Sequence, residues 1–185
     1  MSPPLIVPNR EQRFADLYDT AYADVLRFVQ RRSAVDAAED ITHEAFLVAW
    51  RRFDNIPATA DSARAWLFGV ARNCLLSDRR SRERYELLGV RIAGTMTTPE
   101  DQGTEAVSIR LDLIAAWQRL STTQQEVLSL ALWEELPASA AGRVLGISAA
   151  AYRIRLHRAR NALRGNLDTT PTPAPSPAMT SEITA

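Results

Sequence analysis

The sequence contains no lysine and only one cysteine among its 185 residues. Cys74 cannot form an internal disulfide, and with only two histidines the chain cannot assemble a usual structural zinc site. No apolar run approaches the roughly 18 residues of a membrane span. The first eight residues have neither the basic segment nor the long apolar stretch of a signal peptide. We therefore expect a cytoplasmic protein with no metal, no cofactor and no membrane insertion.

Glycine is also scarce, with seven residues, and β-branched runs are few, whereas 46% of the residues are apolar. This composition favours an all-α fold. Proline-rich ends and a Gly/Thr-rich stretch near the middle divide the chain into two small helical domains joined by a flexible linker. The predicted boundaries are a disordered N-terminus (1–10), a first domain (11–86), the linker (87–105), a second domain (106–165) and a disordered tail (166–185).

Apolar residues in the first domain recur at helical steps three times. The first stripe runs from Phe14 to Val29 and the second from Ile41 to Ala49, after a capping box predicted at Asp36–Glu39. A loop containing Pro57 follows. Asp61 or Ser62 is then predicted to cap a third helix, whose stripe comprises Trp66, Leu67, Val70, Ala71, Cys74 and Leu75.

The second domain ends in a pattern typical of a helix-turn-helix. It begins with a stripe at Ile109, Leu113, Ala116, Trp117 and Leu120, followed by a capping box at Ser121–Gln124. A short helix from Pro137 is predicted to stop at Gly146, and Ser148 to cap a last helix reaching about Arg164. A short helix, a Gly-containing turn and a long basic helix match this motif.

The net charge is zero, but charge is segregated along the chain. Residues 64–84 carry a net charge of +4 and residues 143–164 carry +6, while residues 97–135 carry −5. Two basic segments, one in each domain, suggest two contacts with a polyanion. A solvated face with salt bridges is the alternative. Residues 97–135 are equally open to two interpretations, a solvated face or a surface held on a protein partner.

The last helix separates a core face from an outer face. Tyr152, Leu156, Ala159 and Leu163 lie within one narrow arc and should face the core. The opposite arc should enter a major groove, and it comprises Ala150, Ala151, Arg153, Ile154, His157 and Arg158, with Arg155 and Arg160 beside it to reach phosphates. Few of these side chains can read bases, so DNA shape should contribute.

The basic segment of the first domain combines arginines with aromatic side chains and a polar loop. Phe53, Trp66 and Phe68 accompany Arg64, Arg72, Asn73, Arg79 and Arg80. Aromatic and arginine side chains beside a loop suit unpaired bases, for which stacking contributes about 1–3 kcal/mol each. Core packing is the alternative for Trp66 and Phe68.

The first domain resembles domain two of the sigma-70 family, in its extracytoplasmic-function (ECF, group 4) branch. The matching stretches are AEDITHEAFLVAWRRF and ARAWLFGVARNCLLSDRR. The second domain resembles sigma domain four over LSTTQQEVLSLALWEELPASAAGRVLGISAAAYRIRLHRARNAL. The two motifs stand in the family's order, with a linker where the family has one.

The resemblance implies an alternative sigma factor. Such proteins bind core RNA polymerase through its β′ clamp helices and β flap, select promoter DNA, help open the −10 region and are commonly held by an anti-sigma factor. The polymerase-binding residues would be Asp40, His43, Glu44, Phe46 and Trp50, although Phe46 and Trp50 could equally be core residues. The −10 residues would be Asn55, Ser62, Arg64, Arg72, Asn73, Arg79 and Arg80. The −35 residues would be Ser148, Ala150, Ala151, Arg153, Ile154, Arg155, His157 and Arg158.

The chain departs from the family pattern at three places. His43 replaces a family Gln and can still form a hydrogen bond. Ala140-Ala141-Gly142 replaces a frequent Glu-Ile-Ala, and Tyr152 stands where Val is usual. Glycine within a helix costs about 1 kcal/mol relative to alanine. These departures predict a loosely packed second domain or an unusual target sequence.

Two other classes of protein remain as alternatives. A helix-turn-helix regulator that does not dock on core polymerase would explain the second domain but leave the basic segment of the first without a role. A helical enzyme would need a nucleophile–base pair, metal-ligand spacing or a phosphate-binding loop, and none is found in the sequence. Cys74 lies on an apolar stripe and is predicted to be an inert core thiol. No catalytic residue is expected.

Overall fold

The computed structural model describes residues 9–81 and 104–169. Most of the predicted tail, most of the linker and the first eight residues lie outside this range. The described residues form seven α-helices, and two short 3-10 turns at Val35–Ala37 and Phe53–Asn55. The helices are α1 (Arg10–Gln30), α2 (Ala38–Arg51), α3 (Ala60–Ser81), α4 (Thr104–Gln118), α5 (Thr122–Leu132), α6 (Ala138–Leu145) and α7 (Ala149–Asp168).

Helices α1, α2 and α3 form the N-terminal domain and pack on one another along the three predicted stripes. Val25, Phe28 and Val29 of α1 are fully buried, as is Ala45 of α2. Burial of such stripes is the main source of helix stability in a small domain. The three-helix expectation for this domain is confirmed.

The starts of α2 and α3 differ from the prediction. The capping box at Asp36–Glu39 is wrong, because Asp36 lies in a 3-10 turn and the N-cap position is Ala37, which makes no side-chain cap. Helix α3 begins at Ala60, so Asp61 lies inside its first turn rather than at its cap. Both helices begin within two residues of the aspartate that was expected to cap them. The exact first residue is set by the packing of the apolar stripe that follows.

Helices α4 to α7 form the C-terminal domain, with a small core of Trp117, Leu120, Leu128 and Ala159. The predicted capping box at Ser121–Gln124 is confirmed, with both reciprocal hydrogen bonds present. The stripe predicted in α4 is wrong at its start, because Ile109 is 63% exposed. Only the second half of that helix contacts the rest of the domain closely enough to be buried.

The helix-turn-helix is confirmed in α6 and α7. Gly146 has the left-handed φ of 68° that ends α6, and the Ser148 hydroxyl caps α7 by accepting from the Ala151 amide. Helix α7 continues to Asp168, beyond the predicted end near Arg164 and into residues assigned to the tail. The predicted linker end is also helical, because α4 starts at Thr104.

Gly142 is required by the tight turn between α6 and α7. A Cβ atom built at this position would lie 2.7 Å from the carbonyl oxygen of Ile147. We expected Gly142 to loosen the packing of the second domain, and this is wrong. Because Gly142 has no side chain, the backbone of residues 147–149 can lie close against α6. Tyr152 is likewise 1% exposed, so the larger side chain fills the core.

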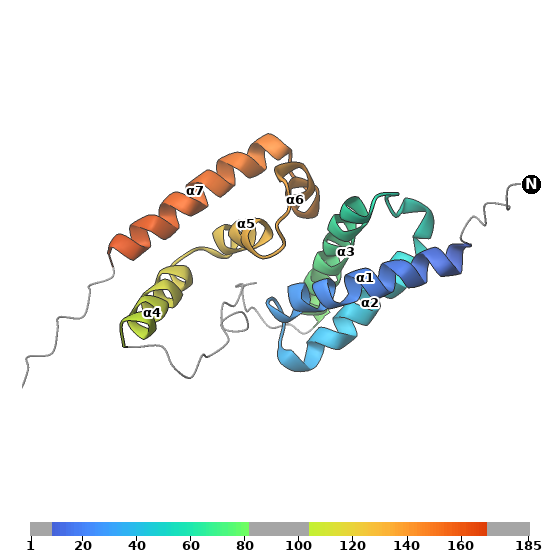
Figure 1. Cartoon of the computed structure of the whole chain (residues 1–185), viewed down its shortest axis with the longest axis horizontal. Helices are drawn as coiled ribbons and strands as arrows, with labels where there is room; N and C mark the ends of the chain where they lie inside the picture. Colours follow the sequence, from blue (N-terminus) through green and yellow to red (C-terminus); the bar gives the residue numbers. More distant parts are fainter. Residues whose placement is uncertain (1–8, 82–103, 170–185) are drawn as a thin grey trace, which may run out of the picture.

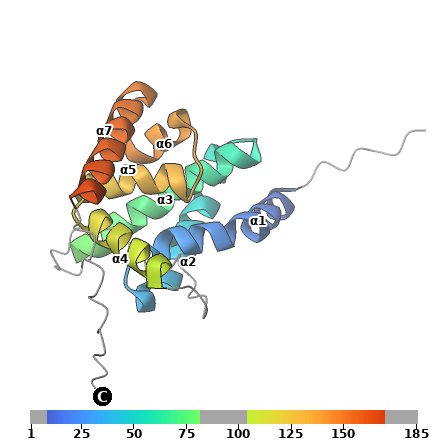
Figure 2. The ribbon, with the colours of Figure 1, turned by 60° about the vertical axis from the view of Figure 1, so that its left-hand side comes forward.

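The two domains pack against each other, which the sequence did not predict. Helices α5 and α6 lie between α7 and the N-terminal domain, and α6 packs directly on α3 (Figures 1 and 2). One apolar cluster includes Phe28, Leu67 and Phe68 from the N-terminal domain together with Val127 and Val144 from the C-terminal domain. The described helices thus share a core across the domain boundary.

Candidate nucleic-acid interface

The outer face of α7 carries exposed basic side chains. Arg153, Arg155 and Arg158 are exposed, and among residues 9–81 and 104–169 none of them forms an ion pair. Ile154 is 54% exposed on the same face, with Ala150 and His157. This face lies opposite the side of α7 that packs on α5 and α6, the helices between α7 and the N-terminal domain (Figure 1). It is the surface through which recognition helices enter a major groove.

The core face of α7 holds this surface in place. Tyr152 and Ala159 are buried, and Leu156 and Leu163 are half-buried, as the helical wheel predicted. The Tyr152 hydroxyl donates to the Val127 carbonyl oxygen at 2.9 Å, which joins α7 to α5. Two of the eight predicted −35 residues have other roles or less exposure: Ser148 caps the helix and Ala151 is half-buried.

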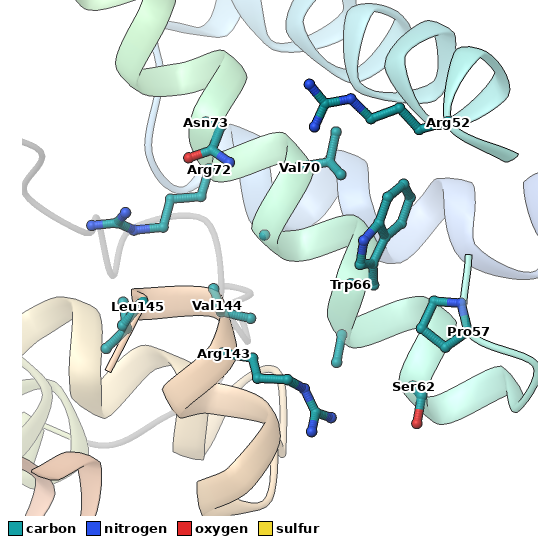
Figure 3. A pocket seen from close by; sticks show the side chains of 13 residues that line it. Arg52, Pro57, Ser62, Trp66, Val70, Arg72, Asn73, Arg143, Val144 and Leu145 are labelled. Carbon is teal, nitrogen blue, oxygen red and sulfur yellow. The ribbon is translucent and has the colours of Figure 1, made fainter. Parts of the chain in front are cut away.

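A cleft lies between α3 and α6 and brings together several predicted −10 residues (Figure 3). Its volume is about 590 Å³. Ser62, Trp66, Arg72 and Asn73 line the α3 side, and the segment 143–146 of the C-terminal domain lines the opposite side. Asn73 is exposed and Trp66 is half-buried. The cleft therefore has an arginine, an amide and an indole on one wall.

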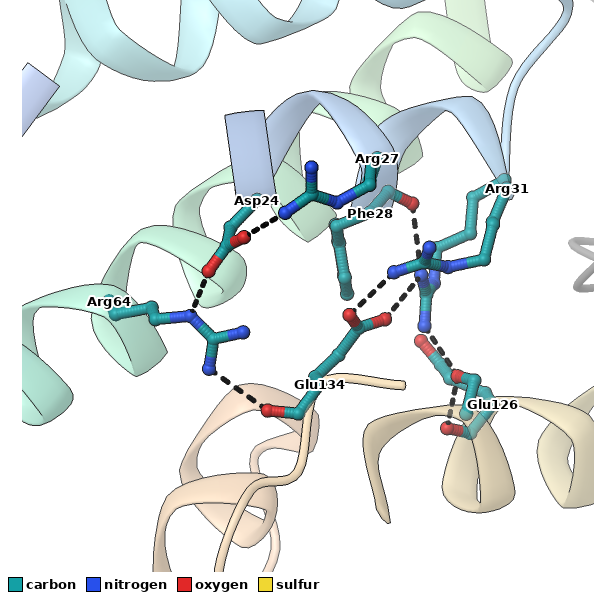
Figure 4. A network of polar contacts seen from close by, with 9 residues as sticks. Asp24, Arg27, Phe28, Arg31, Arg64, Glu126 and Glu134 are labelled. Carbon is teal, nitrogen blue, oxygen red and sulfur yellow. Dashed lines mark hydrogen bonds and ion pairs between the residues drawn. The ribbon is translucent and has the colours of Figure 1, made fainter. Parts of the chain in front are cut away.

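Two of the predicted −10 arginines, Arg64 and Arg72, are already engaged by the C-terminal domain; Figure 4 shows the contacts of Arg64. Arg72 forms a two-point contact with Glu126, from Nε to Oε1 at 2.6 Å and from Nη2 to Oε2 at 3.2 Å. Arg64 donates to Asp24 of its own domain and, at 2.9 Å, to the backbone carbonyl oxygen of Glu134. In this conformation both guanidinium groups are used within the chain.

The remaining predicted −10 residues lie before α3 or near its end. Asn55 is exposed in the turn before α3. Arg79 and Arg80 belong to the last turn of α3. The structure thus brings Ser62, Arg64, Arg72 and Asn73 onto one helix, as the sequence predicted.

The aromatic part of the base-stacking prediction is corrected. Phe68 is fully buried and stacks on Phe28, and Phe53 is 9% exposed. Both are core side chains that a base could not reach in this conformation. Of the three aromatic residues in that prediction, Phe53, Trp66 and Phe68, only Trp66 is partly exposed, and its ring faces the cleft (Figure 3).

The predicted polymerase-binding residues divide between surface and core. Asp40, His43 and Glu44 are exposed on α2. Phe46 is 3% exposed and packs against the rings of Phe14, Tyr18 and Tyr22, so of the two roles that the sequence left open for it the structure supports core packing.

Trp50 occupies an intermediate position. It is half-buried, with its ring against Phe14 and Phe53 and the Arg10 guanidinium 4.5 Å from its centroid. The ring therefore supports the start of α1, and only part of it remains available at the surface.

A buried charge cluster between the domains was missed by sequence reasoning. Arg31 and Arg32, at the end of α1, both contact the carboxylate of Glu134, which follows α5. Glu134 is 1% exposed and Arg32 is 7% exposed. From the sequence, charged residues after the end of a helix are expected to be solvated. No local pattern in the sequence pairs residues about 100 positions apart.

Burial and ion pairing change the acidity of several groups. Burial lowers the pKa of Arg32 to about 10, against the opposing effect of Glu134, so the guanidinium stays charged at neutral pH. Burial alone would raise the pKa of Asp24, but Arg64 and Arg27 outweigh it and the pKa is lowered. Burial raises the pKa of the Cys74 thiol to about 11, as expected for an unreactive core cysteine.

No metal site or membrane span is found within the described ranges. There, no three His, Cys, Asp or Glu side chains are grouped so that they could hold a metal ion. None of the helices there combines the length and the apolar character that crossing a bilayer requires.

These features define a class of protein: an all-helical DNA-binding protein with a helix-turn-helix and a second, arginine-bearing helical domain. Two family models match it, Sigma-70 region 2 at residues 17–85 and Sigma-70 region 4 at residues 110–163. The chain belongs to the sigma-70 family, in its ECF branch. It is an alternative sigma factor that works with RNA polymerase.

Relatives and solved structures support this assignment. The ECF RNA polymerase sigma factor SigL of Mycobacterium tuberculosis is 36% identical over 152 residues, which cover 80% of this chain and 85% of SigL. The ECF factor SigW of Bacillus subtilis is 27% identical over 85% of this chain and 90% of its own.

The fold is shared with two solved structures. The sigma factor RpoE of Bartonella quintana, in complex with the anti-sigma factor NepR, has a TM-score of 0.62 at 22% identity, with 86% of this chain and 99% of RpoE covered. CnrH, in complex with the cytosolic domain of CnrY, has a TM-score of 0.54 at 25% identity, with 87% of this chain and 91% of CnrH covered.

Proposed function

We propose that this sigma factor reads a −35 element as duplex through α7 and holds an opened −10 strand on α3, while α2 docks on core RNA polymerase. The observation that carries this proposal is the separation of two basic surfaces on two domains of one chain. Duplex and single strand require different chemistry, a groove-filling helix in the first case and arginines with a stacking platform in the second.

The −35 assignment rests on the outer face of α7. Arg153 and Arg158 are exposed within about one turn of each other and are not neutralised by an acidic side chain of the described residues. A guanidinium in this position can bind a guanine edge or a phosphate. The exposed Ile154 between them suits a thymine methyl group.

The −10 assignment rests on the cleft face of α3. On this face Asn73 offers an exposed amide, Trp66 an exposed ring edge and Arg72 a guanidinium group. Arg64 is on the same helix but lines a different cavity, next to α1. Stacking and phosphate contacts of this kind bind unpaired bases with little need for base-specific hydrogen bonds. Holding the opened strand offsets the few kcal/mol that unstacking costs.

The polymerase assignment rests on α2. Asp40, His43 and Glu44 present two carboxylates and an imidazole on its exposed face. This acidic face is distinct from both basic surfaces, which suits a protein partner rather than DNA. We expect no chemistry from the chain itself, which would act in the cytoplasm, because bond formation belongs to the polymerase.

A protein that sequesters the free sigma factor is the further partner that we expect. CnrH, one of the solved neighbours, is bound to the cytosolic domain of CnrY. By the family resemblance, an anti-sigma factor would hold this chain until a signal releases it.

Transcription with purified components tests the function. Core RNA polymerase with this chain should start transcripts at a defined set of promoters, and sequencing the starts should reveal two shared elements. A double variant of α2, Asp40→Ala with Glu44→Ala, should lose core binding while its α7 still binds duplex. A chain that binds promoter duplex but never confers start-site selection would instead be a helix-turn-helix regulator, and the proposal would be wrong.

A further inference from the structure

Glu134 lies at the centre of a buried contact between the two domains. Its Oε2 accepts from Arg31 Nη2 at 2.6 Å and its Oε1 accepts from Arg32 Nη1 at 3.3 Å. Arg32 also donates to the Phe28 carbonyl oxygen and to the Ser129 hydroxyl, and its guanidinium lies 3.7 Å from the centroid of the Phe28 ring. A single carboxylate from the C-terminal domain thus compensates two adjacent guanidinium groups that directly follow α1 (Figure 4).

A second contact of the same kind lies at the edge of the interface. Glu126 on α5 binds Arg72 on α3 through both of its carboxylate oxygens. Two-point pairs of this geometry are among the strongest charge-assisted hydrogen bonds. A phosphate group presents the same kind of acceptor to arginine, so Glu126 occupies Arg72 as a nucleic-acid backbone would.

Two buried hydrogen-bond donors of this interface have no partner in the described part of the chain. The Nε atoms of Arg31 and Arg32 are buried and have no hydrogen-bond partner. A buried donor without a partner costs free energy that water would restore when the domains separate. The apolar part of the interface favours closure, whereas these donors favour opening, so the two states are balanced more closely than in a permanent core.

We propose that Glu134 and Glu126 form an intramolecular latch that closes the C-terminal domain onto the N-terminal domain and keeps Arg64 and Arg72 from binding a nucleic-acid strand. The closed state leaves the outer face of α7 free, because Arg153, Arg155 and Arg158 are exposed in it and α7 packs on α4, α5 and α6 of its own domain. The chain therefore controls its two basic surfaces separately. This consequence for the −10 strand rests on the proposed function, whereas the latch itself does not.

A distance measurement on the protein alone tests the latch. Spin labels at Ala15→Cys on α1 and Gln118→Cys on α4 would report the separation of the domains by double electron–electron resonance, since both positions are exposed. Cys74 can stay in place because it is buried. The latched chain should give one short, narrow distance distribution.

Glu134→Gln should open the chain, because it leaves two buried guanidinium groups without a counter-charge. Loss of one partner of a buried pair predicts a rise in the open-to-closed ratio on the order of 100-fold. Glu126→Gln should have a smaller effect, and the double variant the largest. Glu135→Gln is the matched control, since Glu135 is the adjacent exposed glutamate, and its distances should equal those of the unsubstituted chain.

Two results would overturn the latch: an already broad, long distribution in the unsubstituted chain, or an unchanged distribution in the double variant. Far-UV circular dichroism checks that the helices persist. Should Glu134→Gln lose helix content, Glu126→Gln decides the question, because its arginine partner is at the edge of the interface and partly exposed.

A cross-link tests the consequence for transcription. A Cβ atom at Gly69 would lie 3.9 Å from the Cα atom of Val144, so Gly69→Cys with Val144→Cys should form a disulfide in the closed state. The oxidised chain should start no transcripts, and reductant should restore them; Gly69→Cys alone is the control. Normal transcription by the cross-linked chain would refute occlusion. If the reduced and unsubstituted chains also fail, the proposed function is wrong while the distance result still decides the latch.

Discussion

The hydroxyl of Tyr152 lies 2.9 Å from the carbonyl oxygen of Val127 and donates a hydrogen bond to it, with both residues buried. This bond joins α7 to α5, which contacts the N-terminal domain through Glu126. Burial raises the pKa of the Tyr152 hydroxyl to about 12, so it remains a donor throughout the physiological range. Tyr152, which stands where the family usually has Val, therefore connects α7 to α5 within the C-terminal domain.

Tyr152→Phe should destabilise the chain by about 1 kcal/mol, because it removes this hydrogen bond and keeps the ring. Urea unfolding followed by circular dichroism measures the change. Tyr152→Val, which installs the usual family residue, should cost more, about 2–4 kcal/mol, because it also leaves a cavity. Equal stability of all three chains would show that the hydroxyl and the ring contribute nothing here.

Substitution of two helical glycines by alanine should have opposite effects. Gly142→Ala should destabilise by about 1–3 kcal/mol, since the new Cβ would meet the Ile147 carbonyl oxygen at 2.7 Å. Gly165→Ala in α7 should stabilise by up to about 1 kcal/mol, because nothing lies within 4 Å and alanine favours the helix. Thermal unfolding compares the two. A stabilising Gly142→Ala would contradict the close approach of the turn.

Cys74 should not react with a thiol reagent in the native state at about pH 8. Burial, with a smaller contribution from the charge of Glu44, raises its pKa to about 11, so little thiolate is present and access is blocked. Release of the thionitrobenzoate chromophore measures the rate. The reaction should become fast in concentrated guanidinium chloride, and rapid labelling of the folded chain would disagree with the burial of this thiol.

Asp24→Asn should destabilise the chain at neutral pH and lose this effect in acid. The folded-state pKa of Asp24 lies below its usual value of 3.8, because its pairs with Arg64 and Arg27 outweigh the effect of burial. A lowered pKa means that the carboxylate stabilises the fold above pH 3.8 and that this contribution disappears as the pH falls through the folded-state pKa.

Unfolding of both chains at a series of pH values measures this difference. It should be constant near neutral pH and shrink below 3.8. Asp19→Asn, at an exposed position of the same helix, is the control. A difference that stays constant into strong acid would show that Asp24 has no such interaction.

Replacing Arg153 and Arg158 by alanine should weaken duplex binding and flatten its salt dependence. Two lost phosphate contacts predict a decrease of about 2 in the slope of log K against log salt. Fluorescence anisotropy with labelled promoter duplex measures it. The matched variant with lysine at both positions keeps the charge, so it should retain the slope while losing bidentate base contacts. An unchanged slope in the alanine variant would remove these residues from the interface.

Local signals in the sequence predicted the helices and the exposed basic face of α7. The spacing of Val25, Phe28 and Val29, the cap at Ser148 and the glycine at 146 each act within a few residues, so helical periodicity and turn chemistry suffice to read them. The outer face of α7 was predicted for the same reason, because a helix fixes which side chains share a side.

Contacts between distant residues were not predictable in this way. For Phe46 and Phe68 the sequence left a binding surface and core packing open, and the structure decides for the core, since neighbouring helices cover both rings. The capping box at Asp36 looked as good as the one at Ser121, but only the second forms, because a cap depends on where packing starts the helix.

The amino-acid sequence by itself determined two helical domains, a helix-turn-helix and the segregation of arginine into two segments. The tertiary structure alone decided that Glu134 meets Arg31 and Arg32, and that Glu126 takes Arg72. The physical reason is the distance along the sequence over which each interaction acts. Periodicity and capping act over one or two turns of helix, whereas an ion pair between residues about 100 positions apart exists only once an apolar interface has brought their domains together.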